Sequence, residues 1–106
     1  MPDSSSITKP ELVSLLNRET SKIPWSELQR FFASGNAVFV DESLDLIDTA
    51  AEIALDNKEK LQAWMATNKV ANVSDEQAQQ WWDEELTVWA VVVAPWVFVQ
   101  RINKED

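Results

Sequence analysis

The sequence predicts an α+β fold in which about five helices pack on a small sheet of two or three strands. Apolar residues recur with helical spacing in five segments between residues 8 and 82. Two other runs, Asn36 to Asp41 and Leu86 to Arg101, are rich in the valine and aromatic residues that favour strands. The 106 residues are enough for one core. We therefore expect one globular domain over residues 8–102, a flexible tail over residues 1–7 and a polar tail over residues 103–106.

The first two predicted helices begin and end at recognisable signals. Thr8, followed three residues later by Glu11, matches a capping box, so we expect a helix from there to about residue 21. Pro24 suits the opening turn of a second helix. Gly35 is the single glycine of the chain and is placed to end that helix in a left-handed conformation.

Three more helices are predicted further along the chain. The segment over residues 43–56 is apolar around more than half of its circumference, so we expect the central helix there. Asp56 and Glu59 match another capping arrangement, which begins a helix that runs to about residue 68. Ser74 and Gln77 match a further capping box at the start of the last helix.

The run ELTVWAVVVAPWVFVQR, Glu85 to Arg101, has no charged side chain between its two ends. A membrane-spanning helix needs about 20 apolar residues, and this run is shorter, rich in valine and interrupted by Pro95, so it predicts a strand. One straight strand would extend beyond a domain of this size, so we expect a bend or bulge at Pro95. A slip of one residue there would bring Trp96 to the face of Trp89. The expected neighbouring strand is Asn36 to Asp41.

Composition and charge exclude several classes of function. Eighteen acidic and nine basic residues give a formal charge of -9, which repels nucleic-acid phosphates and anionic lipids, so we expect neither nucleic-acid nor membrane binding. The chain has no histidine and no cysteine, which removes the commonest general base and all thiolate chemistry. A single glycine excludes a glycine-rich phosphate loop. The N-terminus lacks a secretory signal pattern, and we expect a cytoplasmic, non-enzymatic protein without a cofactor.

A stripe of acidic residues lies along the central predicted helix. Asp41, Asp45, Asp48 and Glu52 share one narrow sector with Asp56, and like charges at this spacing repel one another. A divalent cation such as Mg²⁺ or a basic partner could offset the repulsion, and the first four residues are the candidate metal ligands of a cation-binding protein or cation-dependent hydrolase. The simpler interpretation is a solvated face, because a straight stripe does not converge its oxygens on one ion.

A second acidic group, Asp83 to Glu85, follows the last predicted helix. Negative charge is unfavourable at the carboxyl end of a helix. The group could act as a charged gatekeeper beside the apolar run that follows. The alternative is a cation site flanked by Trp81 and Trp82.

The chain contains six tryptophans, more than packing usually recruits in so small a core, and tryptophan is enriched at interaction hot spots. Helical spacing assigns Trp25, Trp64 and one of Trp81 or Trp82 to the core. The candidate interaction surface consists of Trp81, Trp82, Trp89, Trp96 and Phe98. It would serve a homo-oligomer or a small accessory subunit with a protein partner. A third hypothesis is an acidic mimic that occupies a nucleic-acid-binding surface. The apolar run needs cover on both faces, and a face without helices would be the partner surface.

Five segments resemble a family of short bacterial proteins known as domain of unknown function 2288. They cover most of the chain after Thr8 and read IPWSELQRFFASGN, LDLID, DNKEKLQAWM, VSDEQAQQWW and WAVVVAPWVFVQ. The resemblance implies a small bacterial, cytoplasmic protein. It brings no assigned activity, cofactor or catalytic residue.

Overall fold

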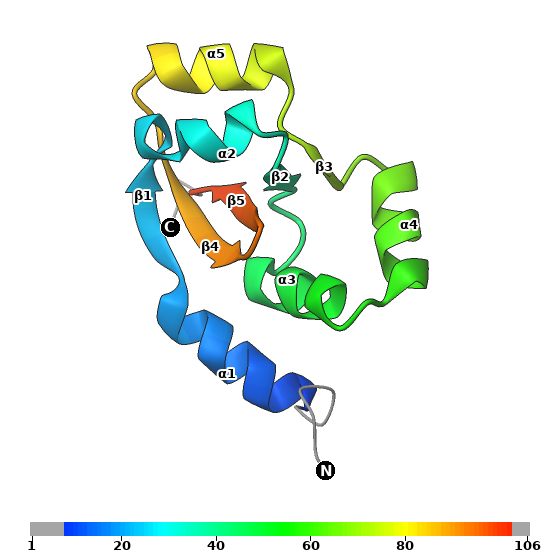
Figure 1. The fold of residues 1–106 in the computed structure, drawn as a ribbon. Helices are drawn as coiled ribbons and strands as arrows, with labels where there is room; N and C mark the ends of the chain where they lie inside the picture. The colour runs from blue at the N-terminus through cyan, green and yellow to red at the C-terminus, as the bar shows by residue number, and fades with distance from the viewer. Residues whose placement is uncertain (1–7, 103–106) are drawn as a thin grey trace.

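The computed structural model describes residues 8–102, and the two predicted tails, residues 1–7 and 103–106, lie outside the described residues. The described chain has five α-helices and five strands, so the predicted α+β class is confirmed and the predicted number of two or three strands is wrong (Figure 1). The elements run in the order α1 (Lys9–Glu19), β1 (Ser21–Pro24), the 3-10 helix η2 (Trp25–Leu28), α2 (Gln29–Ala33), β2 (Ala37–Val40), α3 (Leu46–Ala54), α4 (Lys58–Ala66), β3 (Val70–Asn72), α5 (Asp75–Asp83), β4 (Thr87–Val93) and β5 (Trp96–Arg101).

All five strands belong to one sheet with the order β1-β4-β5-β2-β3. Strands β2 and β5 are parallel, and the other three neighbouring pairs are antiparallel. The expected contact between the strand near residue 38 and the apolar run is therefore present, because β2 pairs with β5. The strands β1 and β3 lie at the two edges and have four and three residues.

The apolar run forms a β-hairpin, and the expectation of one strand bent at Pro95 was wrong. Strands β4 and β5 pair antiparallel, with Val93 opposite Trp96, so Ala94 and Pro95 make a two-residue turn. The reversal brings the run within the size of the domain. Because cross-strand partners share a face and side chains alternate, Trp96 lies on the same face as Trp89. The sequence predicts that a one-residue slip at Pro95 brings Trp96 to the face of Trp89. The two residues do share a face, but the hairpin is the cause.

Strands β1 and β3 were missed by the sequence analysis. The sequence predicts the end of one helix and the start of the next at Ser21 to Pro24, and a connection between helices at Val70 to Asn72. Both strands are too short for a periodic pattern and exist through pairing with β4 and β2. Lys22 and Pro24 on β1 are residues that discourage further pairing at a sheet edge.

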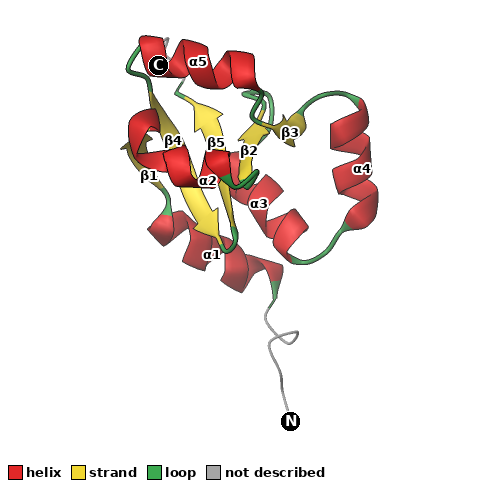
Figure 2. Ribbon diagram, turned by 45° about the horizontal axis from the view of Figure 1, so that its top comes forward, coloured by secondary structure: helices red, strands yellow, loops and turns green. Residues whose placement is uncertain are grey.

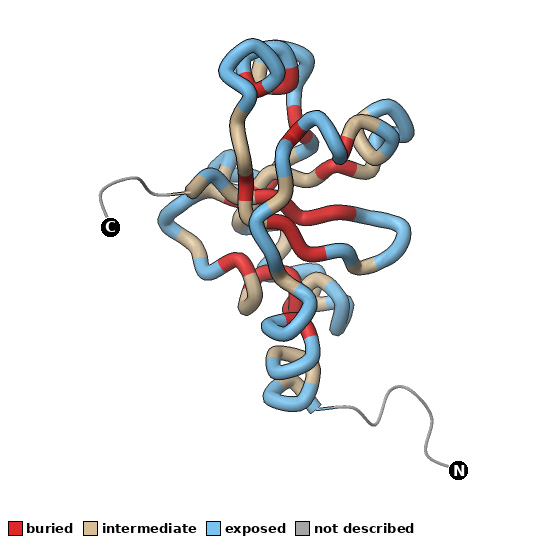
Figure 3. The backbone as a smooth tube through the Cα atoms, turned by 90° about the vertical axis from the view of Figure 1, so that its left-hand side faces the viewer, coloured by how far each residue is buried: buried red, intermediate tan, exposed pale blue. Residues whose placement is uncertain are grey.

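Helices cover both faces of the sheet (Figures 1 and 2). One face, here called the α5 face, packs against η2, α2 and α5; the other, the α3 face, packs against α1 and α3. Side-chain alternation divides the central strands between them: Val97 and Val99 point to the α5 face, and Phe98 points to the α3 face. The buried positions gather along the sheet, and the outer turns of the helices are exposed (Figure 3).

Four helices end in the same way. The second residue after each helix has a left-handed backbone, and the N–H of the residue that follows it donates to the carbonyl five positions earlier, as in the Schellman motif. The left-handed residues are Gly35, Asp56, Asn68 and Glu85. The prediction for Gly35 is confirmed, and the other three positions carry side chains in a conformation that favours glycine.

Helix starts also follow the predicted signals, with two shifts. The capping boxes of Thr8 with Glu11 and of Ser74 with Gln77 are both present. The cap of α3 is Asp45, and the cap of α4 is Asn57, one residue after the predicted Asp56. Asp56 is instead the left-handed residue that ends α3.

Helix α4 stands apart from the rest of the fold. It contacts α3 and β3, and both ribbon views show it beside β3 and separated from the other helices (Figures 1 and 2). None of its residues is buried, and Trp64, which was predicted to lie in the core, is only half-buried. The α3 face of the sheet is therefore left incompletely covered beside this helix.

Candidate functional site

The incomplete cover leaves a groove between α4 and the α3 face of the sheet. Its volume is about 250 Å³. The groove, here called the Trp96 groove, is lined by the apolar residues Val38, Ile53, Leu61, Met65, Val70, Ala71, Trp96 and Phe98. The polar residues Asp56, Asn57, Lys58 and Asn72 complete its lining. It is thus a mainly apolar groove with a few polar groups.

Two large apolar side chains of this groove are exposed. Met65 on α4 has 53% of its surface accessible, and Trp96 at the start of β5 has 41%. Trp96 is exposed because it follows the hairpin turn at the end of the sheet, while Phe98 two residues later is buried under α3. Methionine adapts its shape readily, and tryptophan supplies a large contact area, so both suit a surface that binds another protein.

The five candidate interaction residues separate into three groups. Trp81 and Phe98 are 2% and 1% exposed, so their prediction as surface residues is corrected: they fill the cores of the α5 face and the α3 face. Trp89 is half-buried on the α3 face, and the ammonium of Lys22 lies 5.1 Å from its ring centroid. Trp82 and Trp96 remain as exposed members, with 51% and 41% of their surface accessible.

The tryptophan pair of α5 divides between core and surface, as its helical spacing predicted. The Trp81 ring meets the Trp25 ring edge to face, with 5.1 Å between centroids, and it lies 6.1 Å from the ring of Phe39. Trp82 is the next residue, about 100° further round the helix, and points away from this cluster.

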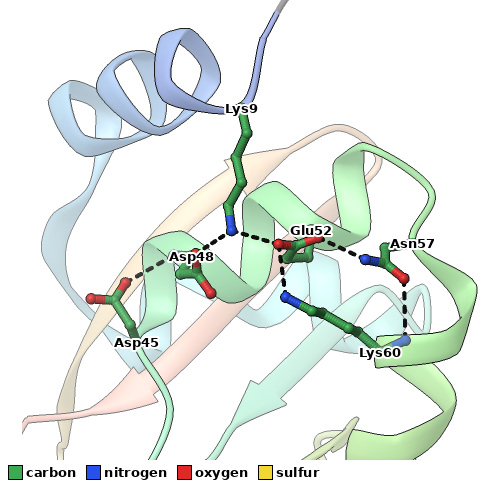
Figure 4. A network of polar contacts seen from close by, with 6 residues as sticks. All are labelled: Lys9, Asp45, Asp48, Glu52, Asn57 and Lys60. Carbon is green, nitrogen blue, oxygen red and sulfur yellow. Dashed lines mark hydrogen bonds and ion pairs between the residues drawn. The ribbon is translucent and has the colours of Figure 1, made fainter.

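The acidic stripe is joined to lysines of the same chain (Figure 4). The Nζ atom of Lys9 on α1 lies 2.6 Å from the Asp48 carboxylate and 2.5 Å from that of Glu52. The Nζ atom of Lys60 on α4 lies 3.1 Å from the same oxygen of Glu52. Asn57 donates a hydrogen bond of 2.9 Å to the other oxygen of Glu52. Helices α1, α3 and α4 are therefore tied together at one carboxylate.

Glu52 is buried, although the stripe was interpreted as a solvated face. Only 7% of this residue is exposed. The hydrogen bonds from Lys9, Asn57 and Lys60 lower the pKa of Glu52 from 4.5 to about 2. Hydrogen bonds to Asp48 and Glu52 raise the pKa of Lys9 above 10.5. The like-charge repulsion along the stripe is therefore offset by two lysines of this chain.

Two other members of the stripe shape the backbone. Asp45 accepts a hydrogen bond of 2.8 Å from the N–H of Asp48 and caps α3. Asp41 accepts a hydrogen bond of 2.9 Å from the N–H of Ser43, and hydrogen bonding to Ser43 lowers its pKa. Within residues 8–102, no group of three or more acidic side chains is arranged to hold a metal ion.

The second acidic group is engaged along its own helix. The side-chain amide of Gln79 donates to Asp83, and that of Gln80 donates to Glu84. Glu85 is the left-handed residue after α5. All three acids are exposed.

The lysine partners were not identifiable from sequence. Lys9 lies 43 residues before Glu52, and no local spacing connects the two. The available signals were the basic residue just inside the capping box of α1 and Lys60 eight residues after Glu52. As for membranes, none of the helices formed by residues 8–102 has the length and apolar character needed to cross one.

Comparison with known proteins identifies relatives in sequence and in fold. The family model described as "Protein of unknown function (DUF2288)" matches residues 11–101. The NMR solution structure of PA1075 from Pseudomonas aeruginosa is similar to this chain with 37% sequence identity and a TM-score of 0.79, and the match covers 100% of this chain and 97% of that one. No curated protein matches the chain.

Proposed function

We propose, for a chain that belongs to the DUF2288 family of proteins of unknown function, a non-enzymatic role in protein association. The protein works as a homo-oligomer or as an accessory subunit bound to a protein partner. The Trp96 groove makes the contact. The observation that carries this proposal is the exposure of Met65 and Trp96 beside a groove of about 250 Å³.

The dimensions of the Trp96 groove suit side chains from another protein surface. Pockets for small ligands usually measure about 300–1,000 Å³ and bury most of the ligand. A groove of about 250 Å³ with two exposed apolar residues instead resembles the anchor pockets of protein interfaces, where one large side chain is inserted. Leu61 and Met65, one turn apart on α4, would form one wall of such an interface.

The absence of histidine and cysteine from the chain supports a role without catalysis. Glu52, the acidic residue with the most strongly lowered pKa, is held ionised by two lysines and is not placed to accept a proton near neutral pH. We further propose the cytoplasm as its location, in keeping with a chain free of cysteine. Divalent-cation binding by Asp41, Asp45, Asp48 and Glu52 stays a prediction that no feature of the described residues favours.

Size-exclusion chromatography with light scattering tests this function at tens of micromolar protein. The wild type is expected to form a dimer or larger species, or to retain a defined partner from an extract of its native bacterium. Trp96→Ser is expected to weaken either association about tenfold or more, because a truncated hot spot typically loses about 2 kcal/mol. For self-association the matched control is Trp82→Ser, which removes a tryptophan of similar exposure that does not line the groove.

Two results together would contradict the proposal. One is a monomeric wild type. The other is a set of retained proteins that is the same for wild type and Trp96→Ser. Loss of association in the Trp82→Ser control, with Trp96→Ser unaffected, would move the contact to the other face of the molecule.

A further inference from the structure

The outer face of α5 carries an exposed tryptophan between two hollows. Trp82 has 51% of its surface accessible and lines both of them. One hollow, of about 500 Å³, lies toward the end of α5 and includes Pro24 and Glu85. The other, of about 460 Å³, lies between α5 and α2 and includes Gln29 and Asp75. About half of the Trp82 surface is therefore accessible, with a hollow on either side of it.

The charges around Trp82 have one sign. The two titratable residues that line the hollows, Asp75 and Glu85, are both acidic. Between residues 70 and 100 the sequence has five acids and no lysine or arginine. These acids are Asp75, Glu76, Asp83, Glu84 and Glu85, and all are exposed. On the neighbouring α2, Arg30 stacks on the ring of Phe31 at 5.1 Å. The surface thus offers an open aromatic ring within a field of negative charge.

Asp75 and Glu76 lie in the first turn of α5, where acids are favourable, but Trp82 and the other three acids are not explained by the stability of this helix. Three of the acids lie at the carboxyl end of the helix, where they oppose its dipole. The core position on this helix is filled by Trp81, so Trp82 adds little to the packing. An exposed indole and unfavourable acids on one surface are, in contrast, the two components of a site for a cationic side chain.

We propose that this surface binds a basic segment of a different protein. An arginine or lysine of that segment stacks on the Trp82 ring, and its neighbours pair with the carboxylates of Asp75 and Glu85. Arginine fits best, because its planar guanidinium both stacks on an aromatic ring and pairs with a carboxylate. The site is separate from the Trp96 groove and does not rest on the function proposed for it.

A second copy of this chain is a poor occupant of the site. The acidic surface around Trp82 would have to meet a basic surface on the other copy, and the chain has twice as many acidic as basic residues. The chain has nine basic residues, and four of them are engaged within it. Lys9 and Lys60 form ion pairs, and Lys22 and Arg30 lie over aromatic rings. A basic segment of a different protein is complementary in charge to the acids that this chain leaves exposed around Trp82.

NMR titration of the full ¹⁵N-labelled chain provides the test. The probe is a synthetic peptide of alternating arginine and alanine, about ten residues long, and the control peptide replaces arginine by its uncharged analogue citrulline. The arginine peptide is expected to shift the indole N–H signal of Trp82 and the amide signals of α5. Its affinity is expected to fall about tenfold in Trp82→Ala, as for the loss of a cation–π contact. Trp96→Ala is expected to leave it within about twofold of wild type.

Charge-matched variants separate a site from a general attraction to an acidic protein. Glu85→Gln and Glu59→Gln remove the same charge from α5 and from α4, and both positions are exposed. Glu85→Gln is expected to weaken binding several-fold more than Glu59→Gln. Equal effects of the two variants, an unchanged affinity in Trp82→Ala, or equal binding of the citrulline peptide would overturn the proposal. Trp82→Phe keeps an aromatic ring, so its affinity for the arginine peptide is expected to lie between those of wild type and Trp82→Ala. Binding by this variant also shows that substitution of Trp82 leaves the protein folded.

Discussion

The two faces of the sheet are covered by helices that are held in different ways. The α5 face is closed by aromatic rings. Trp25 is fully buried, its indole N–H donates a 3.1 Å hydrogen bond to the carbonyl of Ala78, and its ring meets Trp81 and Phe32 edge to face at 5.1 and 5.9 Å. Such pairs stabilise beyond their buried area. Ring packing and this hydrogen bond hold η2, α2 and α5 together, without an ion pair among the described residues.

The α3 face combines small side chains with a charged tie. Helix α3 approaches the sheet closely through Ala50 and Ala51, which are fully buried. Its outer side is joined to α1 and α4 through the carboxylate of Glu52. Helix α4 contributes no buried residue and is held at its start by this tie.

The difference between the faces explains where the groove lies. A charged tie fixes the position of a helix without filling the space beneath it, whereas interlocking rings do both. The apolar surface of Val38 and Trp96 is consequently left partly open beside α4 on the α3 face. On the α5 face the rings fill the space against the sheet, and the hollows lie around Trp82 on the outer side of α5.

Removal of the central ring should have the largest effect on stability. Trp25→Ala is expected to lower the free energy of unfolding by about 4 kcal/mol, since it deletes a fully buried ring and the hydrogen bond from its indole to the Ala78 carbonyl. On the other face, Leu16→Ala is expected to lower it by about 2–3 kcal/mol, because Leu16 is the one buried residue of α1. Urea denaturation measures both. If both variants lose the same free energy of unfolding, or Leu16→Ala loses more, the packing of the α5 face is not the stronger of the two.

Neutralising the charged tie should have a smaller and pH-dependent effect. Glu52→Gln is expected to lower the free energy of unfolding by about 2 kcal/mol at pH 7, since Lys9 and Lys60 lose the carboxylate that pairs with both. The pKa of Glu52 is lowered in the folded chain, so its contribution is present above about pH 4.5 and is lost as the pH falls toward 2. The pKa of Lys9 is raised, so its contribution is present below pH 10.5 and is lost at higher pH.

Thermal unfolding from pH 2 to 7 measures this dependence. Wild-type stability should fall between about pH 4.5 and 2 by more than that of Glu52→Gln. Asp48→Asn is the matched control, because it removes an acid that is half exposed and pairs with Lys9 alone. If stability falls with pH in the same way for wild type and Glu52→Gln, the charged tie contributes nothing to the stability of the folded chain.

The helices of this fold could be predicted from sequence because their signals are local. Thr8 with Glu11 and Ser74 with Gln77 begin helices through contacts three residues apart, and Gly35 ends one through its own backbone. Such signals survive in any tertiary context.

The number of strands and the role of the acidic stripe could not be predicted, because both are decided by contacts between residues far apart in the sequence. From sequence, Pro95 predicts a bend within one strand. A hairpin turn differs from such a bend only in the pairing of Val93 with Trp96, which the sequence does not show. Glu52 reads as one of a row of solvated acids until α1 brings Lys9 beside it. In the candidate site, helical spacing predicts that one of Trp81 and Trp82 is exposed, but which of the two depends on how α5 is turned toward the sheet. The burial of Phe98 and the exposure of Trp96 likewise depend on where the hairpin lies under α3.

The smallest predicted effect separates local strain from packing on the two faces. Glu85 after α5 and Asp56 after α3 both adopt left-handed backbones, with φ of 52° and 63°. Glu85→Gly is expected to raise the free energy of unfolding by about 0.5–1 kcal/mol, because it relieves the strain of a side chain in this conformation and removes a negative charge that opposes the α5 dipole. Asp56→Gly should raise it by only a few tenths, since aspartate tolerates the left-handed region better than glutamate does. Chemical denaturation of the two variants measures the difference.

The strain arises within each helix end, so both gains in stability should persist when the variants are combined with Glu52→Gln. If the gain from Asp56→Gly disappears in that combination, the end of α3 is governed by the charged tie and not by its own backbone.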